Sequence, residues 1–166
     1  QGKDPFTKDE HNLFYRLQAA FTYREMTAFG KDFPIVHKDL WYESAGIFMA
    51  RDEHLYLAVK AGDNDDSHNH NDTGSFTVYK DGKPMFIDVG VETYTKKTFS
   101  PNRYDIWTMQ SSYHNLPSFY DGEKEITEKD GAVYRAENVS YHLDEKLCRI
   151  SMNIAAAYPD ERILSY

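Results

Sequence analysis

Short stretches in which apolar and polar residues alternate dominate the chain from residue 33 onward. The clearest one is residues 148–156, where Cys148, Ile150, Met152, Ile154 and Ala156 alternate with mostly polar neighbours. Alternation with a period of two places the apolar side chains on one face of a β-strand and the polar side chains on the other. Such half-buried strands become stable only when their apolar faces pack against another layer.

Polar turns separate these stretches at regular intervals. Residues 45–51 and 55–61 flank Asp52-Glu53, and residues 75–79 and 85–89 flank a turn that contains Asp81-Gly82. Both patterns predict β-hairpins, the second more strongly, because Asp-Gly suits a tight hairpin turn. We expect roughly seven to ten strands in all, and a mainly β fold built as an antiparallel β-sandwich of the super-sandwich type.

One α-helix is expected before the strands. Thr7 and Glu10 match a capping box, and apolar residues follow at mainly three-to-five-residue spacing until Gly30. The pattern predicts an amphipathic helix over about residues 8–29. The resulting organisation is an N-terminal helix and linker over residues 1–32 and a β-sandwich over residues 33–166.

The charge balance restricts the partners of this chain. Its 166 residues include 19 Lys and Arg against 27 Asp and Glu, which gives a formal net charge of -8. An acidic surface repels phosphate backbones, so nucleic acid is excluded as a partner. Anionic polysaccharides are disfavoured too, unless a metal ion or a partner domain concentrates positive charge at the contact. A mean hydropathy of -0.72 leaves no candidate for a membrane span or a secretion signal.

The cysteine count and the chain ends add two expectations. Cys148 is the single cysteine, so an internal disulfide is impossible and the redox compartment stays open between cytoplasm and periplasm. The sequence starts at Gln1 without an initiator Met and ends in a strand-like run. We expect a piece of a longer protein, with the sandwich truncated at its C-terminus.

The segment from Gly62 to Phe76 is the most informative for chemistry, because it contains His68 and His70 within a polar run. If this run forms a strand, the two imidazoles project from one face and converge on one point. Zinc and similar ions bind neutral imidazole nitrogen together with a carboxylate. Asp88 follows an apolar run in the second hairpin, which returns it toward the histidines, and His114 lies among polar residues and could complete the shell.

Other types of site fit less well. A calcium-binding EF-hand loop starting at Asp63 would need Gly and Glu where His68 and Gly74 stand. A cupin-like metalloenzyme shares the Gly62 and His-x-His spacing, but its carboxylate ligand would fall on Gly74 or Ser75. A serine hydrolase would need a nucleophile elbow, and none is present. A carbohydrate-binding module without catalysis is a further alternative, with Trp41, Trp107 and tyrosines as stacking surfaces.

Several motifs follow one another in order between residues 68 and 115. They are His68-x-His70-x-Asp72-x-Gly74-Ser75-Phe76, Asp81-Gly82-Lys83-Pro84, Asp88-x-Gly90-x-x-x-Tyr94, Arg103-Tyr104 and His114-Asn115. This succession resembles the C-terminal β-sandwich domain of heparinase II/III-like polysaccharide lyases, over roughly residues 43–166. Members of that family join an N-terminal α/α toroid to an antiparallel sandwich, and the active cleft lies between the two domains.

The resemblance implies a role for each matching residue. His70, Asp88 and His114 match the zinc ligands of the family, and His68 matches a sandwich histidine that faces substrate beside the catalytic centre. Tyr104 lies near a tyrosine that some members use to bind substrate in the cleft.

The resemblance also implies a reaction, β-elimination in glycans that contain uronic acid, such as heparan-like polymers or alginate. That reaction needs a donor to the uronate carboxylate, a base at C5 and an acid at the glycosidic oxygen. In the family these groups come mainly from the toroid. We therefore expect a metal-bearing lyase domain that is inactive alone, from a periplasmic or secreted protein whose partner is an acidic polysaccharide.

Overall fold

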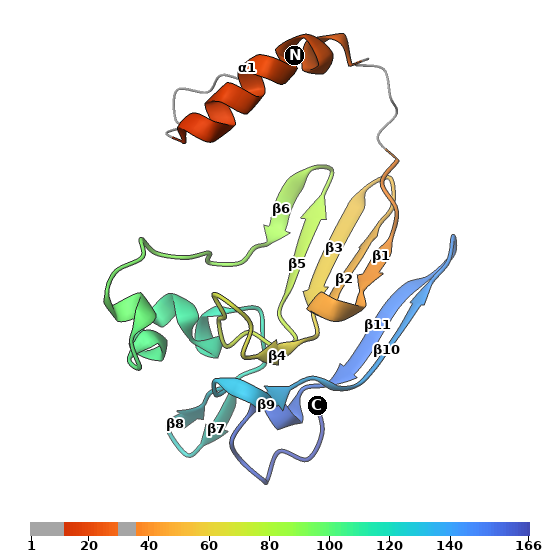
Figure 1. Ribbon diagram of the computed structural model, residues 1–166. Helices are drawn as coiled ribbons and strands as arrows, with labels where there is room; N and C mark the ends of the chain where they lie inside the picture. Colours follow the sequence, from red (N-terminus) through yellow and green to blue (C-terminus); the bar gives the residue numbers. More distant parts are fainter. Residues whose placement is uncertain (1–11, 30–35) are drawn as a thin grey trace. The chain divides into compact units, whose positions relative to one another are not determined.

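The computed structural model of the protein describes residues 12–29 and 36–166. The chain divides into two compact units, Gln1–His37 and Lys38–Tyr166. The first unit contains helix α1, and the second contains all the strands found in the described residues (Figure 1). Within the described ranges, no helix has both the length and the apolar character needed to cross a bilayer. The candidate site lies entirely in the second unit.

Helix α1 covers Leu13–Ala28 and is capped by Asn12, whose side chain accepts a hydrogen bond of 3.0 Å from the Phe14 backbone N–H. An amide at this position satisfies a backbone donor that has no partner inside the helix. The predicted capping box at Thr7 and Glu10 lies outside the described residues. The predicted helix was therefore correct in type, but its described part begins at Leu13 rather than near residue 8.

Five strands form the main antiparallel sheet, in the order β1-β2-β3-β5-β6 (Figure 1). Both hairpins expected from the sequence are confirmed, because β2 pairs with β3 and β5 pairs with β6. The strands are β1 Leu40–Tyr42, β2 Ile47–Arg51, β3 Leu55–Lys60, β5 Phe76–Lys80 and β6 Lys83–Phe86.

Two positions show why glycine is needed in this sheet. In the β5–β6 turn, Asp81 and Gly82 both have positive φ angles, of 49° and 72°, which is the backbone geometry that a tight hairpin demands. Before β2, Gly46 has φ 59°, and a Cβ atom there would lie 2.7 Å from the backbone nitrogen of Gly62. Gly46 therefore permits the close approach of the chain that leads into the His68 loop.

Six further strands form three small antiparallel pairs, which brings the total in the described residues to eleven. The total exceeds the expected number because several of these strands are only two or three residues long. The pairs are β10 Glu137–Leu143 with β11 Cys148–Asn153, β4 Asp63–Asn64 with β9 Gly131–Arg135, and β7 Phe119–Asp121 with β8 Lys124–Ile126.

The core lies between the main sheet and the β10–β11 pair. Phe48, Ala50 and Val59 are buried on the inner face of the main sheet, and side chains of β11, including Ile150 and Met152, pack against them. Burying a large apolar side chain such as Phe48 stabilises the fold by about 2 kcal/mol. The protein is therefore a mainly antiparallel β fold of the sandwich type, preceded by one helix, as expected from the alternating pattern.

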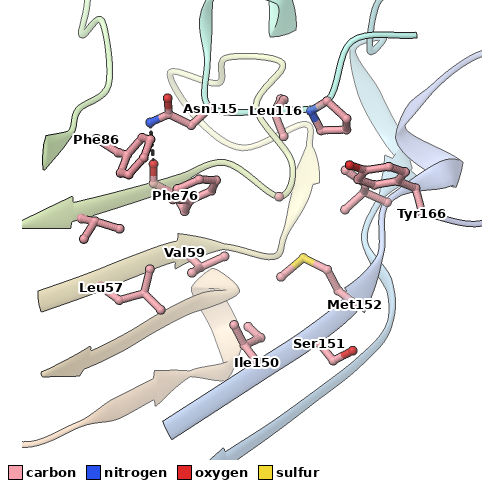
Figure 2. A pocket seen from close by; sticks show the side chains of 14 residues that line it. Leu57, Val59, Phe76, Phe86, Asn115, Leu116, Ile150, Ser151, Met152 and Tyr166 are labelled. Atoms are coloured by element: carbon pink, nitrogen blue, oxygen red, sulfur yellow. Dashed lines mark hydrogen bonds between the residues drawn. The ribbon is translucent and has the colours of Figure 1, made fainter. Parts of the chain in front are cut away.

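An apolar groove of about 760 Å³ runs between the two sheets (Figure 2). Leu57 and Phe76 line it from the main sheet, and Ile150 and Met152 line it from β11. Asn115 and Leu116, from the long connection that follows β6, also contribute to its wall. This connection therefore packs against the edge of the sandwich.

Two irregular segments carry the residues expected to form the site. Residues 61–75 connect β3 to β5 and contain only the two-residue strand β4, and residues 87–118 connect β6 to β7 through four short 3-10 helices. The predicted strand geometry for His68 and His70 is therefore wrong. His68 lies in a turn with φ 62°, a left-handed conformation that breaks the alternation of a strand. Asp88 likewise lies beyond the end of β6, which stops at Phe86.

A buried carboxyl group fixes the first of these segments, residues 61–75. Glu128 is 4% exposed, and its Oε2 accepts hydrogen bonds from the Asn64 side chain, at 2.9 Å, and from the Thr73 backbone, at 3.0 Å. Burial raises the pKa of Glu128 from its ordinary 4.5 to about 7, although both hydrogen bonds act in the opposite direction. The folded protein therefore favours the protonated form of Glu128 more than the unfolded chain does.

This preference predicts a pH-dependent stability that a single substitution removes. Glu128 contributes its stabilisation fully below its unfolded pKa of 4.5, and the contribution is lost as the pH rises through about 7. Between roughly pH 4 and pH 8, the free energy of unfolding should fall by about 3 kcal/mol relative to that of Glu128→Gln, which stays neutral. Urea denaturation of both proteins over this pH range measures the difference.

Glu137→Gln serves as the matched control, because Glu137 is an exposed glutamate on β10. Its stability curve should run parallel to that of the wild type. Parallel curves for wild type and Glu128→Gln would contradict the prediction, since the buried carboxyl would then have the same pKa in the folded and unfolded states.

Candidate metal and substrate site

Asn64 fixes the start of the histidine loop. Its side chain is fully buried and donates to Glu128 Oε2 and to the Lys129 backbone carbonyl, at 2.9 and 3.1 Å. Its Oδ1 atom accepts from the Thr73 hydroxyl at 3.0 Å, and from the backbone N–H of Asp72. Because all of these hydrogen bonds are buried or partly buried, this one amide holds both ends of the loop in place.

Lys60 fixes the middle of the same loop. Its ammonium group lies 2.5 Å from Asp72 and 3.1 Å from Oδ1 of Asn69. The Lys60 and Asp72 side chains are mostly buried, so their ion pair is screened less than an exposed pair would be. Asp72, which belongs to the His68-x-His70-x-Asp72 motif, therefore anchors the loop.

His114 and Asp88 make direct contact. Nδ1 of His114 lies 2.6 Å from Oδ2 of Asp88, and the His114 side chain is completely buried. Burial acts to lower the pKa of His114, but the Asp88 hydrogen bond and the nearby carboxylates outweigh it, so that the pKa is raised. Burial acts to raise the pKa of Asp88, but hydrogen bonds from His114 and Gly90 outweigh this effect and the pKa is lowered. Both shifts favour the form in which Nδ1 of His114 donates its proton to the Asp88 carboxylate.

Asn115 holds the backbone beside this pair. Its side-chain amide donates to the Phe76 carbonyl at 2.7 Å and to the Ile87 carbonyl at 3.1 Å; Figure 2 shows the bond to Phe76. One bond reaches strand β5 and the other reaches the residue that precedes Asp88. Asn115 therefore fixes Asp88 relative to the sheet at a point where β6 has already ended.

His70 lies beside His114. The centroids of their rings are 5.3 Å apart and the ring planes are tilted by 48°. Burial is the largest influence on the pKa of His70 and lowers it, and the neighbouring His114 acts in the same direction. His70 is therefore neutral at physiological pH, with a nitrogen lone pair available to a ligand.

His68 points to a different neighbour. Its Nδ1 atom lies 3.2 Å from the hydroxyl of Tyr94, and the two rings stack with centroids 5.6 Å apart. Unlike His70, the His68 side chain is exposed. The left-handed backbone at His68 therefore gives the two histidines different surroundings, although one residue separates them.

Tyr104 connects to the residue between the two histidines. Its hydroxyl accepts a hydrogen bond of 3.3 Å from the buried side chain of Asn69. The backbone carbonyl of Asn69 accepts two hydrogen bonds from the Arg103 guanidinium group, at 3.0 and 2.8 Å, and the same group donates to the Thr98 carbonyl. The structure thus brings Tyr104 to the histidine loop and fixes it there.

The donor set at His70, Asp88 and His114 fits a divalent metal chemically. Two imidazoles and a carboxylate are ligands that zinc accepts, and the His114 Nε2 atom is buried without a well-formed hydrogen bond in the described residues, although the Thr108 backbone lies close enough to raise its pKa. As placed, no three His, Cys, Asp or Glu side chains in the described ranges are grouped tightly enough to hold a metal ion. Asp88 and His114 are instead joined by their shared proton.

The residues named from the sequence fall into two parts of the site. The structure brings His70, Asp88 and His114 together. It places His68 on the same loop as His70 but beside Tyr94, and it holds Tyr104, from the segment after β6, against Asn69 of that loop. The sequence analysis assigned no role to Asn69, Tyr94 or Arg103. A weak signal existed for the last two, since both belong to the ordered motifs, whereas nothing in the sequence distinguishes Asn69.

Comparison with known proteins gives one positive result. Residues 35–116 match the family described as "Heparinase II/III-like, C-terminal", and this range contains every residue of the site from His68 to His114. A search of curated proteins finds no match. The ordered motifs, the antiparallel sandwich and the family match agree, and we conclude that the chain carries a heparinase II/III-like C-terminal domain.

Proposed function

We propose that this chain is the metal-bearing β-sandwich domain of a polysaccharide lyase that cleaves uronic-acid-containing glycans by β-elimination. The family match supports a polysaccharide lyase as the parent protein. The observation that carries the finer proposal is the contact of His114 with both Asp88 and His70. A partly buried cluster of this composition has no evident role in stabilising the apolar core.

The shared proton between Asp88 and His114 supports zinc as the occupant of this cluster. Metal ligands must be deprotonated, so metal binding releases protons from the groups that receive it. One proton lies between the Asp88 carboxylate and the His114 imidazole, whose atoms are 2.6 Å apart. Zinc would replace that proton, with His70 as the neutral third ligand, and would supply positive charge beside the substrate.

That positive charge would offset the repulsion between an acidic chain and an anionic substrate. The chain has a net charge of -8, and its substrate in this proposal is a polyanion. Like charges slow the association of protein and ligand unless opposite charge is concentrated at the contact. Zinc at His70, Asp88 and His114, together with Arg103 nearby, concentrates it on the face that carries His68.

In this proposal the chain's own residues bind the glycan, and the groups that transfer protons belong to another domain. His68 is exposed and donates to or accepts from the glycan, and Tyr104 contacts the glycan from the other side of Asn69. The base at C5 and the acid at the glycosidic oxygen come from an N-terminal α/α toroid, which forms the opposite wall of the cleft. Because positioning by both walls supplies much of the rate, the domain alone is inactive. We place the parent protein in the periplasm or outside the cell.

The metal assignment predicts a difference between the two histidines of the loop. Purified wild-type protein should bind about one equivalent of zinc, and His68→Ala should retain it. His70→Ala should lose most of the zinc, because it removes a ligand, whereas His68→Ala removes a side chain that bonds Tyr94. Elemental analysis of dialysed protein measures the zinc content.

The His54 and Asp81 pair offers a matched control. It is also a histidine and aspartate contact, with 2.8 Å between Nδ1 and Oδ1, but both of its side chains are more than half exposed. His54→Ala should leave the zinc content unchanged. Equal loss of zinc from the His68→Ala and His70→Ala proteins would show that the two roles are assigned wrongly, and absence of zinc from the wild type would remove the metal from the proposal.

The catalytic assignment predicts activity only in the presence of the toroid. The parent protein should release unsaturated sugars from heparan-like polymers or alginate, which ultraviolet absorbance detects, and should leave neutral glucans intact. The chain alone should show less than about a hundredth of that rate, because it lacks the groups that move the protons. Lyase activity of the isolated chain comparable with that of the parent would contradict this division of work.

A further inference from the structure

The Tyr94 side chain contacts the His68 ring through a hydrogen bond and through ring stacking. Tyr94 lies in the irregular segment after β6, and its hydroxyl is 3.2 Å from Nδ1 of His68, with the two rings nearly parallel at 15°. The rings of Phe99 and Tyr94 pack edge to face, with 5.6 Å between their centroids. Tyr94 therefore has two ring contacts, one with Phe99 and one with His68.

The other nitrogen of His68 is available to a ligand. Its Nε2 atom makes no hydrogen bond to any part of the chain that the structure describes, and the side chain is exposed. In a neutral imidazole one nitrogen carries hydrogen and the other accepts a hydrogen bond. The bond made by one nitrogen sets which tautomer is present, and so decides whether the other nitrogen donates or accepts.

The chemistry of the pair favours one direction for the bond. A phenol is a good hydrogen-bond donor, and an unprotonated imidazole nitrogen is a better acceptor than a phenol oxygen. Tyr94 has no other side-chain acceptor in the described residues, so donation to His68 also satisfies its hydroxyl. Nδ1 of His68 then lacks hydrogen and Nε2 carries it.

We propose that Tyr94 is a positioning residue: its hydroxyl donates to Nδ1 of His68 and so presents the Nε2 hydrogen of His68 to the carboxylate of a uronate glycan. This inference rests on the proposed lyase function and specifies the task of His68 within it. A donor to that carboxylate stabilises the charge that develops when the C5 proton leaves. His68 is then a hydrogen-bond donor to the substrate, and the base at C5 is another group.

The first test observes the tautomer directly. Nitrogen-15 NMR of the chain at about pH 8 should show Nε2 of His68 protonated and Nδ1 unprotonated. In Tyr94→Phe, which keeps the ring and its packing on Phe99 but removes the hydroxyl, the spectrum should move toward the average of two tautomers. Protonated Nδ1 in the wild type, or an unchanged tautomer in Tyr94→Phe, would overturn the inference.

The second test asks whether Tyr94 acts through His68. In the parent lyase, Tyr94→Phe should lower kcat/KM about fivefold, the effect expected of one lost hydrogen bond. In a His68→Ala background the same substitution should have no further effect, because the group that Tyr94 positions is gone. Equal losses in both backgrounds, or no loss in either, would show that Tyr94 does not position His68.

Tyr79→Phe provides the matched control for both tests. Tyr79 lies on β5 and is 37% exposed, close to the 39% of Tyr94, and its ring contact is with Tyr56. It should leave the His68 tautomer and kcat/KM unchanged. A parent protein that fails to cleave any uronate glycan would overturn the proposed function and the donor role together, whereas a wrong tautomer in an active lyase would overturn this inference alone.

Discussion

The site depends on the hydrogen bonding of buried amides in the segment between β3 and β5. Asn64, Asn69 and Asn71 are all buried, and an amide removed from water without a partner destabilises a fold by a few kcal/mol. Each finds partners across the structure: Asn64 and Asn71 reach the Glu128 region, and Asn69 reaches Lys60 and Tyr104. An irregular loop is thereby held as firmly as a strand, which a site of defined geometry requires.

The same bonds connect the site to the rest of the sandwich. The backbone N–H of Glu128 donates to the Ser111 hydroxyl, and Ser111 begins the short helix that precedes His114. The backbone of Asn71 also donates to the Met109 carbonyl. The loop of His70 and the segment of His114 are therefore fixed by common neighbours, so the spacing of the two imidazoles is determined by residues that contact neither ring.

Sequence periodicity predicted the architecture well because the strands have one apolar and one polar face. The hairpins around Asp52-Glu53 and Asp81-Gly82 were recoverable from alternation and turn residues alone. The site was predictable only through the ordered motifs, since contacts such as Asn64 with Glu128 join residues 64 positions apart and leave no local pattern. The left-handed turn at His68 was not predicted either, because the sequence His-x-His is equally compatible with a strand and with a turn.

That turn explains how two histidines separated by one residue have different surroundings. On a strand, His68 and His70 would project from one face and share their surroundings. The φ of 62° at His68 breaks this relation, and such a conformation is uncommon for a residue other than glycine. Arg103 offsets the strain by binding the carbonyl of Asn69, directly between the two histidines, with two hydrogen bonds. One fixed peptide unit therefore places a half-buried imidazole beside His114 and an exposed imidazole beside Tyr94. It would also separate the proposed metal ligand from the proposed substrate donor.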